Sequence, residues 1–389
     1  MNPMVLPMVL AGAGAASAMG LVVSQARRRS LDRWLPSYLE ETARRRPPRA
    51  GEPVHLLLAI ADHFEPGRDG VAPAVARARV DRWVQDYPRL FGALCDSDGR
   101  PPRHTFFYPI DEYQPEHLDA LVPLCRAGYG EVEVHLHHDG DRPEQLRAQL
   151  LHFKDILAAR HGLLPRHRDT GERAYGFVHG NWALDNARPD GRCCGVNNEL
   201  DILRQTGCYA DFTLPSAPSP TQTRKINSIY YATDDPHRPK SHDSGIDVGA
   251  GPAPPEALLL IQGPLLLDWS DRKWGILPHV ENGCLQESQP PRIDRLDLWL
   301  TARVQVRTRP DWFFVKLYTH GAEDYNMRVL LDEPMVQFHQ ALARRAGEDP
   351  AFHYHYVTAR EMVNLVRAAE AGWTGSVASA RDYQLVWDH

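Results

Sequence analysis

Histidine and acidic side chains gather directly behind several short apolar runs of the sequence. The groups in question are Asp62-His63, His135-Leu136-His137-His138-Asp139, His179-Gly180-Asn181-Trp182 and Thr319-His320. Imidazole together with carboxylate suits divalent ions such as Zn²⁺, Fe²⁺, Mn²⁺, Co²⁺ and Ni²⁺. The pattern therefore predicts a metal site, with zinc as the first choice. The alternative is a structural cluster held by hydrogen bonds alone.

The composition is ordinary for a globular chain except in histidine. The sequence has 389 residues, of which 19 are histidines, and its formal net charge is −6. This balance excludes the basic excess that nucleic-acid binding requires, so we expect no nucleic-acid partner. No C-x-x-C pair occurs among the six cysteines, which argues against a zinc ribbon. The adjacent Cys193 and Cys194 are interpreted as reduced, inert thiols, with a redox switch as the alternative.

Strand-like and helix-like segments alternate along the chain and must position these groups. We expect strands at 54–61, 104–108, 131–137, 175–178, 209–214, 227–232, 257–262, 312–318 and 353–357. We expect helices at 77–87, 115–127, 142–161 and 197–205, and a last helix capped by Thr358 with Glu361 three residues on. Such alternation predicts an α/β fold, a distorted (β/α)7–8 barrel whose active site lies where the strands end. A long insertion at 215–253 would decorate one face.

The strand ends suggest particular ligands. The metal would be held by Asp62, His63, His135 and Asp139, with His137 as a further ligand or as a partner that orients one. Glu65 is interpreted as a turn residue before a proline.

The order of several motifs resembles that of the polysaccharide deacetylases (carbohydrate esterase family 4). The motifs are Thr105-Phe106-Phe107-Tyr108, Gly128-Tyr129-Gly130, Glu131-Val132-x-x-His135, Leu317-Tyr318-Thr319-His320 and Tyr356-Val357-Thr358-Ala359-Arg360-Glu361. The resemblance runs from about residue 54 to 370. Three departures are visible: Ala59-Ile60-Ala61-Asp62-His63-Phe64-Glu65 stands for the family's T-F-D-D, Asp139 for the second histidine of H-x-x-x-H, and the segment 175–182 for Arg-x-Pro-Tyr-Gly.

The resemblance implies a metal-dependent hydrolase of the glycoside hydrolase/deacetylase barrel type. It would remove N- or O-acetyl groups from a cell-surface polysaccharide or its lipid-linked precursor, as in exopolysaccharide biosynthesis. The family's mechanism makes Asp62 and His320 catalytic, His320 being the acid, and makes Asp62 and His135 metal ligands. It resembles most the uncharacterised deacetylase-like proteins of surface-polysaccharide loci.

Carbohydrate would be bound beside this centre. Trp182 is expected to stack on a sugar ring or to pack in the barrel mouth, with His179, Asn181 and Asp185 contacting the substrate. Two other functions remain open. One is a glycoside hydrolase that uses two carboxylates such as Asp62 and Asp185. The other is a non-catalytic carbohydrate-binding or assembly subunit.

The N-terminal region predicts membrane association. Residues 1–26 contain no charged side chain, and Arg27, Arg28 and Arg29 follow. Positive charges on this side favour an uncleaved inner-membrane anchor with a cytoplasmic catalytic domain. Export, suggested by Ala16-Ser17-Ala18, and a soluble extension are the alternatives. Residues 27–50 form an amphipathic linker that lies on the membrane or packs on the domain, and 51–389 form the barrel.

Overall fold

A central, largely parallel sheet organises the protein, whose computed structural model describes Ser24 and residues 30–387. The sheet order is β12-β1-β2-β3-β5-β6-β9-β7-β8, and β13 also pairs with β1. Its strands are β1 (Val54–His63), β2 (His104–Pro109), β3 (Gly130–Leu136), β5 (Tyr175–His179), β6 (Cys208–Asp211), β7 (Ile229–Thr233), β8 (Ile246–Asp247), β9 (Ala257–Ile261), β12 (Trp312–Thr319) and β13 (Phe352–Tyr356). Every pairing from β12 to β9 is parallel, whereas β7 and β8 join antiparallel.

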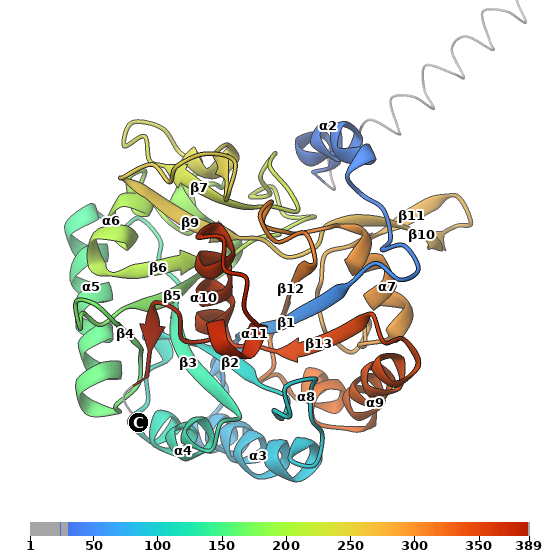
Figure 1. The fold of residues 1–389 in the computed structure, drawn as a ribbon. Helices are drawn as coiled ribbons and strands as arrows, with labels where there is room; N and C mark the ends of the chain where they lie inside the picture. The colour runs from blue at the N-terminus through green and yellow to red at the C-terminus, as the bar shows by residue number, and fades with distance from the viewer. Residues whose placement is uncertain (1–23, 25–29, 388–389) are drawn as a thin grey trace, which may run out of the picture.

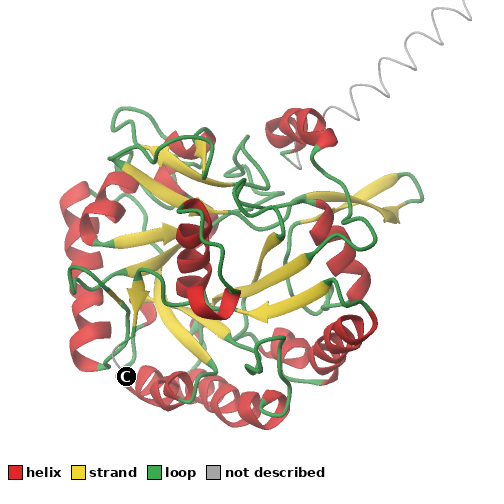
Figure 2. Ribbon diagram, viewed as in Figure 1, coloured by secondary structure: helices red, strands yellow, loops and turns green. Residues whose placement is uncertain are grey.

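Helices flank the sheet on its outside, and one helix lies within its curve (Figures 1 and 2). The outer helices include α3 (Pro73–Phe91), α4 (Pro115–Arg126), α5 (Pro143–Asp155), α6 (Glu199–Thr206), α7 (Ile293–Thr301), α8 (Asp324–Leu330) and α9 (Glu333–Glu348). The inner helix is α10 (Ala359–Glu370), followed by α11 (Val377–Ala380). The mixed α/β class predicted from the sequence is confirmed. Among the described residues, however, the path of paired strands ends at β12 and β8, so the expected closed barrel is not among the pairings.

Two apolar layers, one on each face of the sheet, follow from the alternation of side chains along each strand. In β1 the even-numbered Leu56, Leu58 and Ile60 belong to the layer beneath the outer helices. The odd-numbered Leu57, Ala59 and Ala61 belong to the inner layer with α10. Successive side chains of a strand point to opposite faces, and burial on both faces explains the continuous apolar run.

The inner helix α10 begins at the capping box that the sequence predicts. Thr358 accepts a hydrogen bond from the Glu361 amide, and the Glu361 side chain accepts one from the Thr358 amide. Its residues Met362, Val363 and Val366 are buried in the inner layer. The helix therefore fills the inside of the curved sheet with apolar side chains.

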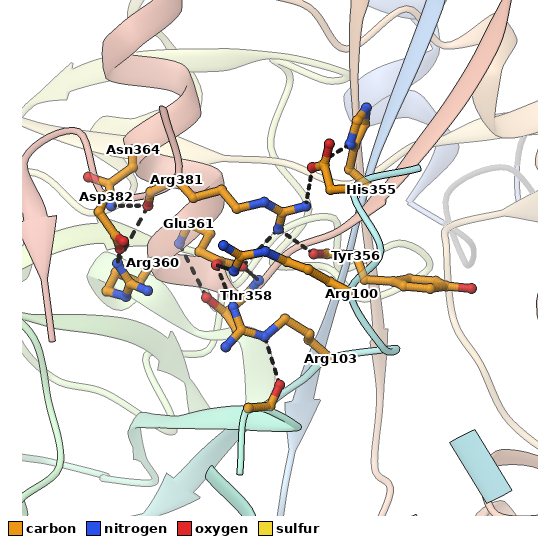
Figure 3. Close-up of polar contacts among 12 residues, drawn as sticks. Arg100, Arg103, His355, Tyr356, Thr358, Arg360, Glu361, Asn364, Arg381 and Asp382 are labelled. Atoms are coloured by element: carbon orange, nitrogen blue, oxygen red, sulfur yellow. Dashed lines mark hydrogen bonds and ion pairs between the residues drawn. The ribbon is translucent and has the colours of Figure 1, made fainter. Parts of the chain in front are cut away.

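Arginines and carboxylates connect the start of α10 to neighbouring strands (Figure 3). The Arg381 guanidinium lies 2.8 Å from an Asp98 carboxylate oxygen and 3.3 Å from one of Glu361. Arg360 pairs with Glu131 at 2.8 Å. These buried charges compensate one another, so we assign the network to folding.

Most of the predicted strands and helices are present, with shifted ends. The 227–232 prediction corresponds to β7, within the expected insertion, and the 142–161 helix changes at Ile156 from α5 to a π-helical turn. The sequence analysis missed the hairpin of β10 (Leu266–Lys273) and β11 (Leu277–Glu281), and the helices α7 to α9. It also missed the short pair of β4 (Arg166–His167) with β14 (Leu385–Val386).

The amphipathic segment packs on the domain. Helix α2 (Leu31–Glu40) buries Trp34 completely against Ala217, Ile226 and Leu265. In the part of the chain that the structure describes, no helix is long and apolar enough to cross a bilayer. The predicted anchor at 1–26 lies outside the described residues except for Ser24.

Candidate metal and active site

Asp62 and His63, adjacent in the sequence, point to opposite faces of the sheet. Asp62 follows Ile60 onto the outer face, where its carboxylate accepts hydrogen bonds from His104 Nε2 at 2.8 Å and from the Gly321 amide at 2.6 Å. A Cβ at position 321 would lie 2.1 Å from Asp62 Oδ2, so glycine is required for this approach. Asp62 thus joins β1, β2 and the turn after β12, and it does not line the cavity described below.

Glu65 is the centre of the inner-face cluster. Its Oε1 lies 3.1 Å from His135 Nε2 and 2.8 Å from His137 Nε2. Potential ligand atoms of His63, Glu65 and His135 lie within 4.8 Å of one another, and all three residues are buried. The interpretation of Glu65 as a turn residue before a proline is therefore incomplete, since its carboxylate contacts two histidines. The sequence contains one signal for this position: Glu65 follows His63 by two residues, the spacing that places both side chains on the same face of an extended strand.

The ring of His135 is oriented for a cation. Its Nδ1 lies 2.8 Å from the Val178 carbonyl oxygen, which can only accept, so Nδ1 carries a proton. In the neutral ring Nε2 then presents a lone pair to the Glu65 carboxylate. Two acceptors 3.1 Å apart require a proton or a metal ion between them. A histidine ligand whose other nitrogen donates to a carbonyl is the usual arrangement at metal centres.

His137 lies between two carboxylates. Its Nε2 faces Glu65, and its Nδ1 lies 3.2 Å from Asp111 Oδ2. Burial acts to lower the pKa of His137, but the hydrogen bonds to Asp111 and Glu65 outweigh it and raise the pKa to about 10. For Glu65, burial acts to raise the pKa, but the adjoining His135 and His137 imidazoles hold it well below its usual range. The cluster therefore contains a carboxylate and a charged imidazole at neutral pH.

Aromatic rings form the rest of the wall. The His63 ring centroid lies 4.9 Å from that of His320 and 6.0 Å from that of Trp182. Burial lowers the pKa of His320 to about 4, so this ring is neutral. Trp182 has a φ of 54°, within a segment where Asn181 also has a positive φ. Non-glycine residues in this region cost about 1 kcal/mol or more, and such strain concentrates at functional sites.

These groups border a cavity of about 220 Å³. Its lining consists of His63, Glu65, Arg68, Asp69, Asp111, Glu112, His137, Asn181, Trp182 and His320. Burial raises the pKa of Glu112 to about 7, against the opposing effect of a hydrogen bond from the Gly67 amide. A larger cavity of about 460 Å³ borders the arginine network of Figure 3, but its carboxylates are already paired.

The other residues predicted for the site lie elsewhere. Asp139 accepts a hydrogen bond from the Cys193 amide at 2.7 Å. The Asp185 carboxylate accepts one from the Ser241 amide at 2.6 Å. His179 is on the outer face of β5, in a second buried cluster with His138, Cys194 and Glu199. Asp139, Asp185 and His179 are absent from the lining of the cavity, as is Asp62, so the glycosidase pair Asp62 and Asp185 has no common opening there.

A third group of possible ligands is occupied by an arginine. Asp96, Asp98 and His355 lie together, but Arg381 Nη2 contacts Asp98 at 2.8 Å and Asp96 at 3.2 Å. The guanidinium supplies the positive charge that a metal would bring.

Comparison with known proteins provides no family for this chain: no protein-family model matches it, and no curated protein matches it significantly. The chemistry of the site is therefore the basis for a functional conclusion.

Proposed function

We propose that the protein is a metal-dependent hydrolase that removes N- or O-acetyl groups from a cell-surface polysaccharide or its lipid-linked precursor. The observation that supports this most is the buried Glu65 carboxylate facing the lone pair of His135, with His63 beside them, at the wall of an accessible cavity. His63, Glu65 and His135 are three protein ligands with an open side. Three ligands with an open position are typical of catalytic zinc sites.

The residues present fit a divalent cation, with zinc first. Such an ion supplies Lewis acidity towards an acyl oxygen and acidifies water at neutral pH. His63, Glu65 and His135 would hold it. The Val178 carbonyl fixes the His135 ring, so the orientation of this ligand is set before any ion binds.

The remaining groups of the cavity have distinct tasks in this proposal. The neutral His320 accepts the proton of the attacking water, and the charged His137 donates a proton to the leaving group. This assignment differs from that implied by the resemblance, which makes His320 the acid. Trp182 packs against one face of a sugar ring at the rim. The cavity of about 220 Å³ suits an acyl group better than a whole oligosaccharide.

The finer architecture belongs to the same proposal. Strands β1, β2, β3, β5 and β6 follow one another in the sheet, all parallel, around a helix-filled interior. This order supports the proposal of a distorted (β/α)7–8 barrel, with the site at the carboxyl ends of its strands. Membrane association through residues 1–26, with a cytoplasmic catalytic domain, completes the proposal.

Elemental analysis followed by an acetate-release screen on N-acetylated glycans tests the function. We expect bound zinc and acetate release in the wild type, and loss of the acetate release in His135→Ala. His152→Ala is the matched control, since His152 is an exposed residue of α5. Sugar release without acetate would replace the proposal with a glycosidase. Glycan binding without either product would leave a binding subunit.

A further inference from the structure

A second cluster of four potential ligands lies on the outer face of the sheet. Its members are His138, His179, Cys194 and Glu199, which come from the loop after β3, the end of β5, the loop 187–198 and the first residue of α6. His138 is 8% exposed and the other three are fully buried. One ligand atom from each lies within 4.8 Å of all the others.

Hydrogen bonding within the chain satisfies this cluster only in part: His138 Nε2 and Cys194 Sγ contact Glu199, whereas one nitrogen of each histidine has no partner. The His179 Nδ1 contacts the Gly180 carbonyl oxygen, which can only accept, so Nδ1 carries a proton. The buried His179 Nε2 has no hydrogen-bond partner and faces Glu199 Oε1 at 3.4 Å. A neutral ring therefore presents a lone pair to a carboxylate in the protein interior. Unpaired buried polar atoms are rare in folded proteins and indicate an absent water or ion.

His138 lies on the other side of Glu199, with its Nε2 hydrogen-bonded to that carboxylate and its buried Nδ1 without a hydrogen-bond partner. Its Nε2 lies 3.3 Å from the same Glu199 Oε1, and its Nδ1 lies 3.4 Å from Asp141 Oδ2. In both rings Nδ1 faces an oxygen acceptor while Nε2 faces the centre of the cluster. Metal-ligating histidines almost always donate their second nitrogen to a carbonyl or carboxylate, as His179 does to the Gly180 carbonyl.

Two distances within the cluster match the edges of a tetrahedron. Metal–nitrogen and metal–oxygen bonds of about 2.0–2.1 Å give tetrahedral edges of about 3.3–3.4 Å. The two nitrogen–oxygen separations, 3.3 and 3.4 Å, have this length. An additional ligand is the sulfur of Cys194, whose thiol lies 3.3 Å from Glu199 Oε2. Burial and the Glu199 carboxylate raise the pKa of this thiol, so an ion must displace its proton to bind the sulfur. The amides of Asn186 and Val196 both donate to Cys194 Sγ, at 3.3 and 3.4 Å.

We propose that His138, His179, Cys194 and Glu199 bind a structural zinc ion on the outer face of the sheet. Two imidazoles, one thiolate and one carboxylate select zinc among the common divalent ions, and a closed set of four protein ligands is the structural type. A nucleophilic role for Cys194 does not fit, because a buried sulfur cannot reach a substrate.

The ion would hold the loop that carries Trp182 against the sheet. Glu199 Oε2 accepts a hydrogen bond from the Asp185 amide at 2.6 Å, and Cys194 accepts one from the Asn186 amide. Asp185 and Asn186 both have positive φ, so their turn needs external support. Zinc bonded to Cys194 and Glu199 on the loop side, and to His138 and His179 on the strand side, supplies that support. This inference does not depend on the activity proposed for the inner cluster.

Cobalt substitution distinguishes the two clusters, because the inner one contains no cysteine. In the full chain loaded with Co²⁺, we expect the near-ultraviolet absorption of a cobalt–thiolate bond. The band should persist in Glu65→Gln, which removes a ligand of the inner cluster, and disappear in Cys194→Ala. Cys193→Ala is the matched control, because Cys193 is adjacent in sequence but outside the cluster. It should retain the band.

Elemental analysis gives the stoichiometry. The Glu65→Gln protein should still contain one zinc per chain, and Cys194→Ala should contain one fewer than the wild type. If Cys194→Ala does not fold, the Co²⁺ spectrum of the wild type decides by itself. Wild-type protein that takes up cobalt without a thiolate band would overturn the structural site, as would a band retained in folded Cys194→Ala. Neither result would bear on acetate release.

Discussion

The inner and outer clusters of this protein are built from similar kinds of residue but differ in their number of potential ligands and in their access to solvent. The inner one, His63, Glu65 and His135, has three ligands and borders a cavity. The outer one has four ligands, including a cysteine, and is closed. Open three-ligand sites perform chemistry, and closed four-ligand sites stabilise folds. The number of potential ligands and the access of solvent distinguish the two functions that we propose, whereas the residue types alone do not.

Successive residues of a strand point to opposite faces of the sheet, and this alternation places the two clusters on different faces. His135 continues the inner face of β3, and His179 continues the outer face of β5, after Phe177. A shift of one residue in either strand would exchange these faces, because the side-chain period is two. Close packing also limits the space between them: a Cβ at Gly180 would lie 2.3 Å from His137 Cδ2.

Loss of the inner carboxylate should produce the largest effect. In Glu65→Gln, acetate release should fall by about 10³-fold or more, since a ligand and the counter-charge of His137 are removed together. The cobalt–thiolate band should not change. Acetate assays, elemental analysis and the spectrum of the same preparation check this expectation. If the Glu65→Gln protein lacks the zinc of the inner cluster but still releases acetate, the inner cluster is not the catalytic centre.

Removal of an outer ligand should destabilise the protein without directly altering the inner cluster. In His179→Ala we expect the unfolding free energy to fall by about 3 kcal/mol or more. The reason is that the buried Glu199 carboxylate loses the ion that would balance its charge. Hydrogen exchange should accelerate in residues 180–198. Denaturant unfolding measures the first effect and mass spectrometry the second. Unchanged exchange in this loop would contradict its attachment through the cluster.

Substitution of Asp62 tests whether this carboxylate, on the outer face of β1, stabilises the fold or binds metal. Asp62→Ala leaves His104 Nε2 and the Gly321 amide without their acceptor, at a cost of about 2–3 kcal/mol. Metal content should stay at the wild-type value, because Asp62 belongs to neither cluster of potential ligands. Elemental analysis beside denaturant unfolding tests this. A metal content lower by one equivalent would restore Asp62 as a ligand.

His339 should make the unfolding free energy depend on pH independently of the two clusters, since it is buried outside both. Burial lowers the pKa of His339 to about 3. The unfolded chain therefore binds more protons below pH 6.5, and the unfolding free energy should decrease by about 2 kcal/mol between pH 6.5 and 5 from this residue. His339→Asn should have a correspondingly smaller pH slope in denaturant titrations. Equal slopes would show that His339 is protonated in the folded protein.

The smallest effect is expected at the rim of the cavity. Trp182→Ala should reduce kcat/KM for the glycan about tenfold by loss of stacking, with most of the change in KM. Trp182→Phe should retain most of the affinity. Steady-state kinetics on the active glycan measures both variants. A tenfold loss in kcat alone would assign Trp182 to the reaction instead of to binding.

Local patterns in the sequence predicted the elements well where apolar residues have a clear period. The capping box at Thr358 and Glu361 and the buried run of β1 are examples. The β10–β11 hairpin was missed because its burial pattern is mostly exposed, with no apolar period to detect. For the site, the spacing predicted that histidines meet at strand ends, and His63, His135, His137 and His320 do border one region.

The sequence by itself determined which chemistry is available: imidazole, carboxylate and thiol groups behind the strands of a parallel α/β sheet. Only the tertiary structure decided how they divide. In the folded chain Asp62 and His63 point to opposite faces of the sheet, and Glu65 contacts His135. Cys194 lies in one cluster with histidines that are more than ten residues away in the sequence. The physical reason is that strand parity fixes the direction of each side chain. The packing of loops such as 180–198 against the sheet, which no local pattern encodes, then decides which side chains meet.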